Sequence, residues 1–397
     1  MMKMFMGFRL KTWFLLFGVC LLLIGSYLYT RPIPQLTAST VSFSSPAKPV
    51  SLPWPTYGQG ALAEKDFGLL ATHGEQKAVP MASTAKIVTA LAVIKQKPLK
   101  TGEQGPIITI DQVDVDSYNS YYSRGGAVAK VVAGEQISQY QALQAMLIPS
   151  ANNFAGTLAR WAFGSIENYV QYANQMLADM KLKNTKVADA SGFSPNSVSS
   201  ADELVSLGKA LMESPVLAEV VSQQTAEIAV AGKVNNINWL LGSDGVVGIK
   251  TGSTDEAGGC FVFAAKRQIL GQDMTFIGAV MAAPNRNQAI SDSRAVLRSL
   301  EANFEQRIIT KKGQVVGGLS AAWDASADIV VADDFKVVAW KGASLDAKNQ
   351  INGIKAPMSA GSTVGQMKVT LGINDVTTPL ILKNSLESPP WHWRLLR

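Results

Sequence analysis

Histidine and cysteine are scarce in this sequence, and their scarcity limits the chemistry that the chain can carry out. Two histidines among 397 residues, His73 and His392, are too few for a zinc site, and no His-Glu-x-x-His motif occurs. The nucleophile elbow Gly-x-Ser-x-Gly is also missing, so a serine–histidine–acid triad has little support. If the protein is a hydrolase, we expect its general base to be a residue other than histidine.

The two cysteines cannot build a disulfide framework, because Cys20 lies within an apolar run and leaves Cys260 without a partner. Hydrophobic residues make up 47% of the chain and charged residues 17%, which indicates a globular protein. The net charge of +6 suits an anionic surface such as membrane lipid or an acidic polymer. No cluster of lysine and arginine is interleaved with aromatic residues, so nucleic acid is not an expected partner.

Residues 1–30 are predicted to be a membrane anchor or a signal segment. The apolar run from Trp13 to Tyr29 follows Lys3, Arg9 and Lys11 and is just long enough to span a bilayer. No clear Ala-x-Ala cleavage site follows it, so we favour an uncleaved anchor in the cell membrane over a cleaved signal and secretion. In either case the rest of the chain would lie outside the cytoplasm.

The segment 31–56 is rich in proline, serine and threonine. This composition predicts an extended stalk between the membrane and the first domain.

Residues 57–305 are expected to form an α/β (α+β) domain with one sheet flanked by helices, because strand patterns stand at both ends and helical patterns lie between them. The expected strands are 60–63, 67–71, 246–251, 260–265 and 275–281, and the expected helices are 138–148, 154–163, 166–180, 201–212 and 291–304.

From residue 306 the pattern changes. Short strand-like runs at 330–340, 366–371 and 377–382, separated by glycine and asparagine turns, predict a small all-β domain over 306–385. The tail 386–397 mixes aromatic residues with arginine and is expected either to touch a membrane interface or to fray.

The stretch 81–94 is the most informative part of the chain. It begins with Ser83-Thr84-Ala85-Lys86, continues almost entirely with apolar residues, and therefore predicts a buried helix with Ser83 as its N-cap. Burial and the positive end of the helix dipole both favour the neutral form of the Lys86 amine. A neutral amine beside a serine hydroxyl can activate that hydroxyl as a nucleophile without histidine.

Two further motifs have a suitable context, although each pattern also occurs elsewhere in the chain. Ser150-Ala151-Asn152 lies in a loop between two helices, and Lys250-Thr251-Gly252 ends a strand, where a lysine can face a cleft. The copies of Ser-x-x-Lys at 45–48 and 206–209 lie in the stalk and on a solvated helix face.

Taken in order, the three motifs resemble those of the penicillin-recognising serine enzymes, and their spacings resemble those of the low-molecular-mass D-alanyl-D-alanine carboxypeptidases. The resemblance covers about residues 58–304 and implies a β-lactamase/transpeptidase-like domain. Residues 354–365 resemble the C-terminal β domain of that family.

The resemblance implies a role for each motif. Ser83 would attack the carbonyl between the last two D-alanines, Lys86 would take its proton, and Ser150 would relay a proton to the leaving amine. Asn152 would hold the substrate amide.

Other groups would bind the substrate. Lys250 and Thr251 would bind the terminal carboxylate, and Arg286 is a candidate for a second carboxylate-binding residue. The backbone N–H groups of Ser83 and Ser253 would form the oxyanion hole, and Gly252 would allow the strand and the substrate to approach closely.

The implied activity is a serine D-Ala-D-Ala carboxypeptidase that trims peptidoglycan stem peptides, is acylated by β-lactams, and needs no cofactor or metal. The alternatives are a transpeptidase, an endopeptidase or a β-lactamase on the same site, or an inactive peptidoglycan-binding module. No Glu-x-x-Leu-Asn follows Asn152, so the deacylating glutamate of class A β-lactamases is missing, and Asn153 stands where the family commonly has aspartate.

Overall fold

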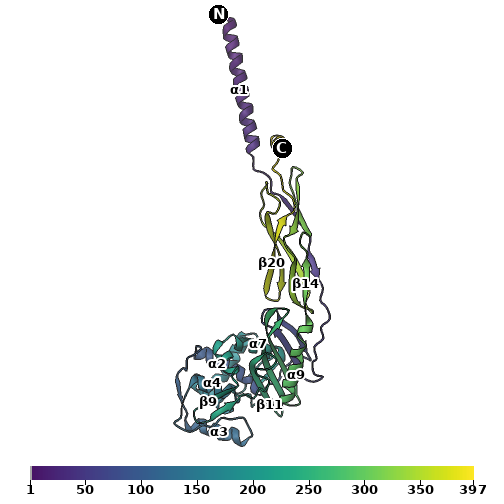
Figure 1. Ribbon diagram of the computed structural model, residues 1–397. Helices are drawn as coiled ribbons and strands as arrows, with labels where there is room; N and C mark the ends of the chain where they lie inside the picture. Colours follow the sequence, from purple (N-terminus) through teal and green to yellow (C-terminus); the bar gives the residue numbers. More distant parts are fainter. Residues whose placement is uncertain (1) are drawn as a thin grey trace. The chain divides into compact units, whose positions relative to one another are not determined.

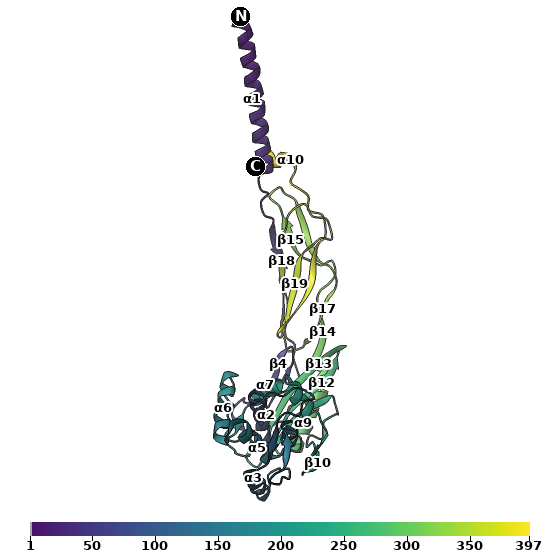
Figure 2. The same ribbon diagram turned by 90° about the vertical axis from the view of Figure 1, so that its left-hand side faces the viewer.

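The computed structural model describes the backbone of residues 2–397 and the side chains from Thr12 onward. The chain folds into two compact units (Figures 1 and 2). The motif unit, named for the three motifs that it contains, comprises residues 49–305 and 340–342. The β unit comprises the residues up to 48 together with 306–339 and 343–397.

The motif unit is built on a five-stranded antiparallel sheet of order β11-β12-β13-β3-β4. Val262 and Ala264 of β12 pack into the main core beneath the helices, whereas Phe261 and Phe263 are buried on the other face, which α9 covers. The strands are β3 (Gln59–Glu64), β4 (Gly68–His73), β11 (Val246–Thr254), β12 (Gly258–Ile269) and β13 (Gln272–Ala283), and α9 spans Arg286–Arg298.

The remaining helices enclose the core on the first face of the sheet, where α7 packs directly on β3, β12 and β13. They are α2 (Lys86–Gln96), α3 (Gln112–Ser123), α4 (Gln139–Leu147), α5 (Asn152–Phe163), α6 (Ile166–Asp179), α7 (Ala201–Met212) and α8 (Pro215–Val221). Shorter elements connect them: β5 (Val79–Pro80), η1 (Ala82–Ala85), β6 (Ile107–Thr109), β7 (Gln136–Ser138), β8 (Val198–Ser199), β9 (Thr225–Ile228), β10 (Gly232–Asn235) and η2 (Glu301–Asn303).

The predicted sheet flanked by helices is confirmed, and α7 has the predicted bounds. The predicted helix 291–304 is wrong at both ends, because the Asn285 side chain caps a helix that begins at Arg286, and the chain enters a strand at Phe304. The run 330–340 is two strands rather than one, because the chain turns between Val331 and Phe335.

The β unit contains a seven-stranded sheet of order β1-β15-β16-β20-β19-β18-β2, which confirms the predicted all-β C-terminal domain. A two-stranded sheet of β14 and β17 accompanies it. The strands are β1 (Thr37–Thr40), β2 (Phe43–Ser45), β14 (Phe304–Thr310), β15 (Val315–Ser320), β16 (Ser326–Val331), β17 (Phe335–Trp340), β18 (Leu345–Ile351), β19 (Thr363–Leu371) and β20 (Asn374–Leu382).

Part of the predicted stalk belongs to this sheet. β1 pairs with β15 at one edge and β2 pairs with β18 at the other, so residues 37–45 join the two edges. The Asn349 side chain fixes the bend between them, because its Nδ2 donates to the carbonyl oxygens of Val41 (2.9 Å) and Val316 (3.0 Å). These residues are therefore held in place rather than forming a free linker.

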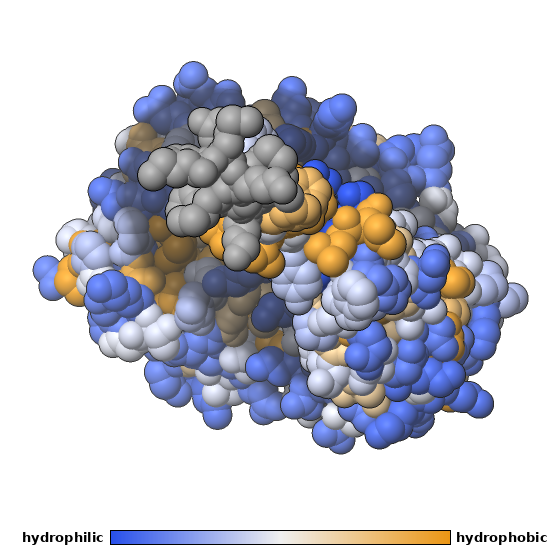
Figure 3. Space-filling view, turned by 90° about the horizontal axis from the view of Figure 1, so that it is seen from above, coloured by the Kyte–Doolittle hydropathy of each residue, from blue (hydrophilic) through white to orange (hydrophobic). Residues whose placement is uncertain are grey.

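The N-terminal helix α1 (Met2–Thr30) includes a segment, Thr12–Thr30, that is long and apolar enough to cross a membrane. None of that segment is buried, and Figure 3 shows hydrophobic surface gathered around the helix. The C-terminal helix α10 (Trp391–Leu396) packs against the end of α1. Arg397 donates to the carbonyl of Arg31 (2.5 Å), and the Arg394 guanidinium lies 4.9 Å from the centre of the Tyr29 ring.

Candidate active site

Ser83 lies in the 3₁₀ turn η1, directly before α2. No side chain caps either helix, and the Thr84 hydroxyl bonds instead to the Met81 carbonyl (2.6 Å). The preceding residue, Ala82, has φ +47°, in the left-handed region that costs a non-glycine residue energy. The prediction that Ser83 is the helix N-cap is therefore wrong, and its hydroxyl is not committed to the helix backbone.

Lys86 is fully buried, and its Nζ has three oxygen neighbours. They are Ser83 Oγ at 2.8 Å, Asn152 Oδ1 at 2.7 Å and the Ser191 carbonyl oxygen at 2.8 Å. Burial lowers the pKa of Lys86 from 10.5 to about 7, and the carboxylate of Asp189 opposes this shift.

The three neighbours of Lys86 fix what its amine can do. Two of them, the amide oxygen of Asn152 and the carbonyl of Ser191, can only accept hydrogen bonds, so they take both N–H groups of a neutral amine. The lone pair then faces the Ser83 hydroxyl, which can donate its proton to it. This is the arrangement that a lysine general base requires.

A tight turn that the sequence analysis missed supports Lys86 from behind. The carboxylate of Asp189 accepts hydrogen bonds from the backbone N–H groups of Ser191 (3.2 Å), Gly192 (3.1 Å) and Phe193 (3.0 Å). It also accepts from the hydroxyls of Ser191 and Ser197, both at 2.6 Å. The sequence signal for this turn is an aspartate followed three residues later by a glycine, here with φ +73°.

The second motif lies between α4 and α5. Ser150 is in the left-handed region with φ +65°, and Asn152 is the first residue of α5. Asn152 Oδ1 accepts from Lys86, and its Nδ2 is left to donate to a substrate. The Asn152 backbone N–H donates to the Ala127 carbonyl (2.8 Å), which ties the motif to the segment after α3.

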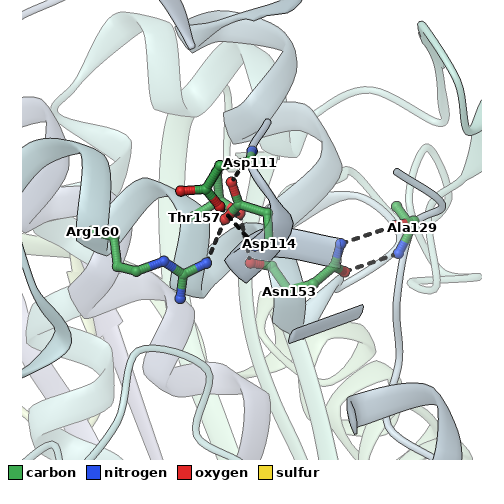
Figure 4. A network of polar contacts seen from close by, with 6 residues as sticks. All are labelled: Asp111, Asp114, Ala129, Asn153, Thr157 and Arg160. Carbon is green, nitrogen blue, oxygen red and sulfur yellow. Dashed lines mark hydrogen bonds and ion pairs between the residues drawn. The ribbon is translucent and has the colours of Figure 1, made fainter. Parts of the chain in front are cut away.

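Asn153 extends this connection (Figure 4). Its side chain accepts from the Ala129 N–H (3.1 Å) and donates to the Ala129 carbonyl (2.9 Å). Further along α5, Thr157 (2.6 Å) and Arg160 both bind the buried carboxylate of Asp114 in α3. An aspartate could not donate to Ala129, so the asparagine at 153 suits a site where one side chain pairs with both backbone groups.

Lys250 is buried in β11, where its Nζ donates to the Thr251 carbonyl (3.0 Å). Burial lowers its pKa well below 10.5, and the charges of Lys86 and Arg286 lower it further. Lys250 and Arg286 thus lie in one small region, which favours the binding of an anion.

Gly252 brings β11 against η1. A Cβ at this position would lie 2.9 Å from the backbone nitrogen of Ser83, closer than real side chains come. Glycine therefore lets the strand approach the turn, and the predicted oxyanion donors, the N–H groups of Ser83 and Ser253, border the same cavity.

Arg286, the first residue of α9, also borders this cavity. Its Nε is buried and has no hydrogen-bond partner within the part of the chain that the structure describes. A buried, unpaired guanidinium nitrogen calls for an acceptor, and a substrate carboxylate would supply one.

The structure therefore brings the predicted site residues together around one cavity of about 350 Å³. Lys86 and Lys250 lie buried beside it. The predicted residues that line the cavity are Ser83, Ser150, Asn152, Thr251, Gly252 and Ser253.

Two family models match most of this chain. A family model for D-alanyl-D-alanine carboxypeptidases (peptidase S11) matches residues 64–285, more than half of the chain. A model for the C-terminal domain of penicillin-binding protein 5 matches residues 304–388.

Individual relatives are distant. The chain is 23% identical to D-alanyl-D-alanine carboxypeptidase DacF of Bacillus subtilis over 77% of this chain and 79% of the relative. It is 27% identical to a D-alanyl-D-alanine endopeptidase of Pseudomonas aeruginosa over 57% of this chain and 74% of the relative. The structure of penicillin binding protein 5 from Haemophilus influenzae superposes with a TM-score of 0.60 at 21% identity, covering 86% of this chain and 99% of that one.

Proposed function

The chain belongs to the D-alanyl-D-alanine carboxypeptidase family and is a serine D-Ala-D-Ala carboxypeptidase, and from this premise we propose that Ser83 is its nucleophile and Lys86 its general base. One observation carries the assignment: the two N–H groups of a neutral Lys86 are taken by Asn152 and Ser191, so its lone pair faces Ser83.

The proposed acylation step needs one proton transfer in each direction. As Ser83 Oγ bonds to the carbonyl carbon before the terminal D-alanine, its proton passes to Lys86 Nζ. The backbone N–H groups of Ser83 and Ser253 stabilise the oxyanion. The C–N bond then breaks, and the proton returns through the Ser150 hydroxyl to the leaving amine. Water hydrolyses the acyl-enzyme and restores the serine.

Lys250, Thr251 and Arg286 are proposed to bind the terminal carboxylate of the substrate. The pKa of Lys250 is low mainly because the amine is buried, and repulsion from Lys86 and Arg286 lowers it further. An arriving carboxylate offsets that repulsion and favours the charged ammonium. Substrate binding is therefore coupled to protonation of Lys250.

The family acts on peptidoglycan peptides and binds β-lactams. For this chain we propose acylation by β-lactams and a retained membrane anchor, with the catalytic unit outside the cytoplasm. The packing of α10 against α1 supports retention, because cleavage after Thr30 would remove the Tyr29 ring that the Arg394 guanidinium covers.

The test is to locate the penicillin adduct by mass spectrometry and to measure D-alanine release from a pentapeptide ending in D-Ala-D-Ala. We expect the adduct on Ser83, and equimolar D-alanine and tetrapeptide as products. Ser206→Ala, at the exposed second copy of the Ser-x-x-Lys motif, is the control and should label normally. An adduct on any other residue contradicts the assignment.

The rate of acylation should rise with pH through neutrality. Because the pKa of Lys86 is about 7, the amine is protonated below that value and cannot accept the serine proton. We expect the second-order rate constant for penicillin acylation to fall about tenfold per pH unit below pH ~6 and to level off above pH ~8. Stopped-flow acylation across this range checks the prediction, and a flat profile would rule out Lys86 as the base.

A further inference from the structure

Arg124 follows α3 as its C-cap and lies at the wall of the catalytic cavity. Its guanidinium lies 5.0 Å from the centre of the Tyr121 ring and 4.8 Å from that of Phe193. The two rings are in edge-to-face contact at 5.4 Å. Stacking on aromatic rings stabilises a guanidinium in one orientation without neutralising its charge.

One edge of this guanidinium is also fixed. Nε donates to the Ser120 carbonyl (3.0 Å) and Nη2 to the Ser120 hydroxyl (3.2 Å). No carboxylate pairs with Arg124 in the described chain, whereas Arg160 and Arg294 of the same unit each bind an aspartate. Arg124 is thus a cation with a fixed orientation at the cavity wall, and no carboxylate of the described residues is paired with it.

The segment that carries Arg124 is held against the catalytic residues. A Cβ on Gly126 would lie 2.8 Å from Asn152 Nδ2, and Ala127 and Ala129 are hydrogen-bonded to Asn152 and Asn153. The segment that carries Arg124 is therefore positioned in part by Asn152, which also binds Lys86.

Charges of the opposite sign lie at the same cavity. Asp255 and Glu256 are exposed in the turn after β11, line the cavity, and form no ion pair within the described residues. They follow Ser253 along the strand, whereas the proposed carboxylate site at Lys250 and Thr251 precedes it. They are consequently on the side of the site where the substrate residue that precedes the two D-alanines would lie.

We propose that Arg124, Asp255 and Glu256 form a subsite for the side chain of the residue that directly precedes D-Ala-D-Ala. This side chain ends in both a carboxylate and an ammonium group. Diaminopimelate has such a side chain, whereas lysine has the ammonium alone. Arg124 binds the carboxylate, and the two acidic residues face the ammonium. The inference rests on the proposed function, because it uses the same acylation site.

The test compares two peptides that end in D-Ala-D-Ala and differ only in the preceding residue, diaminopimelate or lysine. We expect the wild-type enzyme to prefer the diaminopimelate peptide by about tenfold in kcat/KM, the effect of one charge-assisted hydrogen bond. In Arg124→Gln the ratio of the two kcat/KM values should fall to about two or less, mainly because KM for the diaminopimelate peptide rises. Arg124→Lys, which keeps the charge but not the planar fork, should give an intermediate ratio.

Lys130→Gln is the matched control, because it removes an exposed positive charge from the same segment and Lys130 does not line the cavity. It should keep the wild-type ratio. Rates are expressed per penicillin-labelled site, so that only folded enzyme is counted. A wild-type preference for lysine, or an unchanged ratio in Arg124→Gln, overturns the subsite. Failure of the proposed function would appear separately, as wild-type enzyme that penicillin does not label at Ser83.

Discussion

Lys86→Ala should lower the rate of penicillin acylation by about 10³-fold or more, in line with the loss of a positioned base. Among the residues whose side chains the structure describes, the substitution removes the one amine that contacts the Ser83 hydroxyl. The nearby Lys250 cannot replace it without breaking the hydrogen bond of its Nζ to the Thr251 carbonyl. Stopped-flow measurements with a fluorescent penicillin give the rate directly.

Two companion variants separate loss of the base from loss of structure. Lys86→Arg keeps a cation, but a guanidinium stays protonated at neutral pH and cannot accept the serine proton, so we expect it to be as slow as the alanine variant. Lys95→Ala removes an exposed lysine from the same helix and should acylate normally. Near-wild-type acylation by Lys86→Ala would show that another group is the base.

The alanine variant will also lose stability, because Asn152 Oδ1 and the Ser191 carbonyl each lose a buried donor. Unsatisfied buried acceptors cost about 1–3 kcal/mol each. Acylation should therefore be measured well below the melting temperature of each variant, which circular dichroism provides.

The parts of the fold that the sequence predicted well are those with long apolar patterns. The helix over 201–212 has buried positions at helical spacing, and β12 and β13 contain continuous apolar runs that are buried, so local pattern and tertiary packing agree. The three motifs could be found for the same reason, since each adjoins such an element.

Two of the elements that the sequence analysis missed, α3 and β1, depend on contacts with distant residues. In α3, Asp114 is the only fully buried residue, and its hydrogen bonds to Thr157 and Arg160 in α5 hold the helix together with the half-buried side chains of Val115 and Tyr118. β1 is exposed at all four residues, so no alternation marks it as a strand, and only its pairing with β15 defines it. A pattern within a short stretch of sequence contains neither the hydrogen bonds between α3 and α5 nor the pairing of β1 with β15.

The site was predictable as a set of residues but not as a geometry. The Ser-x-x-Lys spacing suggested a helix cap at Ser83, whereas the structure places this serine in a 3₁₀ turn after a residue with positive φ. That turn is held from outside the motif, by residues 189–193 and by Gly252, and none of these contacts can be inferred from the four motif residues.

Gly192 is the residue of the 189–193 turn at which a substitution should disturb the Ser83–Lys86 pair most. We expect Gly192→Ala to abolish penicillin labelling and to destabilise the motif unit by about 3 kcal/mol or more. Gly192 has φ +73°, and a Cβ there would overlap the carbonyl oxygen of Ala82, directly before the nucleophile. Either Ala82 or the turn carrying the Ser191 carbonyl must move, and both position the Ser83–Lys86 pair. Thermal unfolding and penicillin labelling of the purified variant measure the two effects.

Gly271→Ala is the matched control, because Gly271 has φ +83° but a Cβ there would meet no atom within 4 Å. It carries only the cost of the left-handed conformation, about 1–2 kcal/mol, and should label with penicillin at the wild-type rate. The difference between the two variants therefore isolates the clash at Ala82 from backbone strain. Equal losses of stability, or normal labelling of Gly192→Ala, would mean that the turn can shift without disturbing the base, and that the 189–193 segment does not position Lys86.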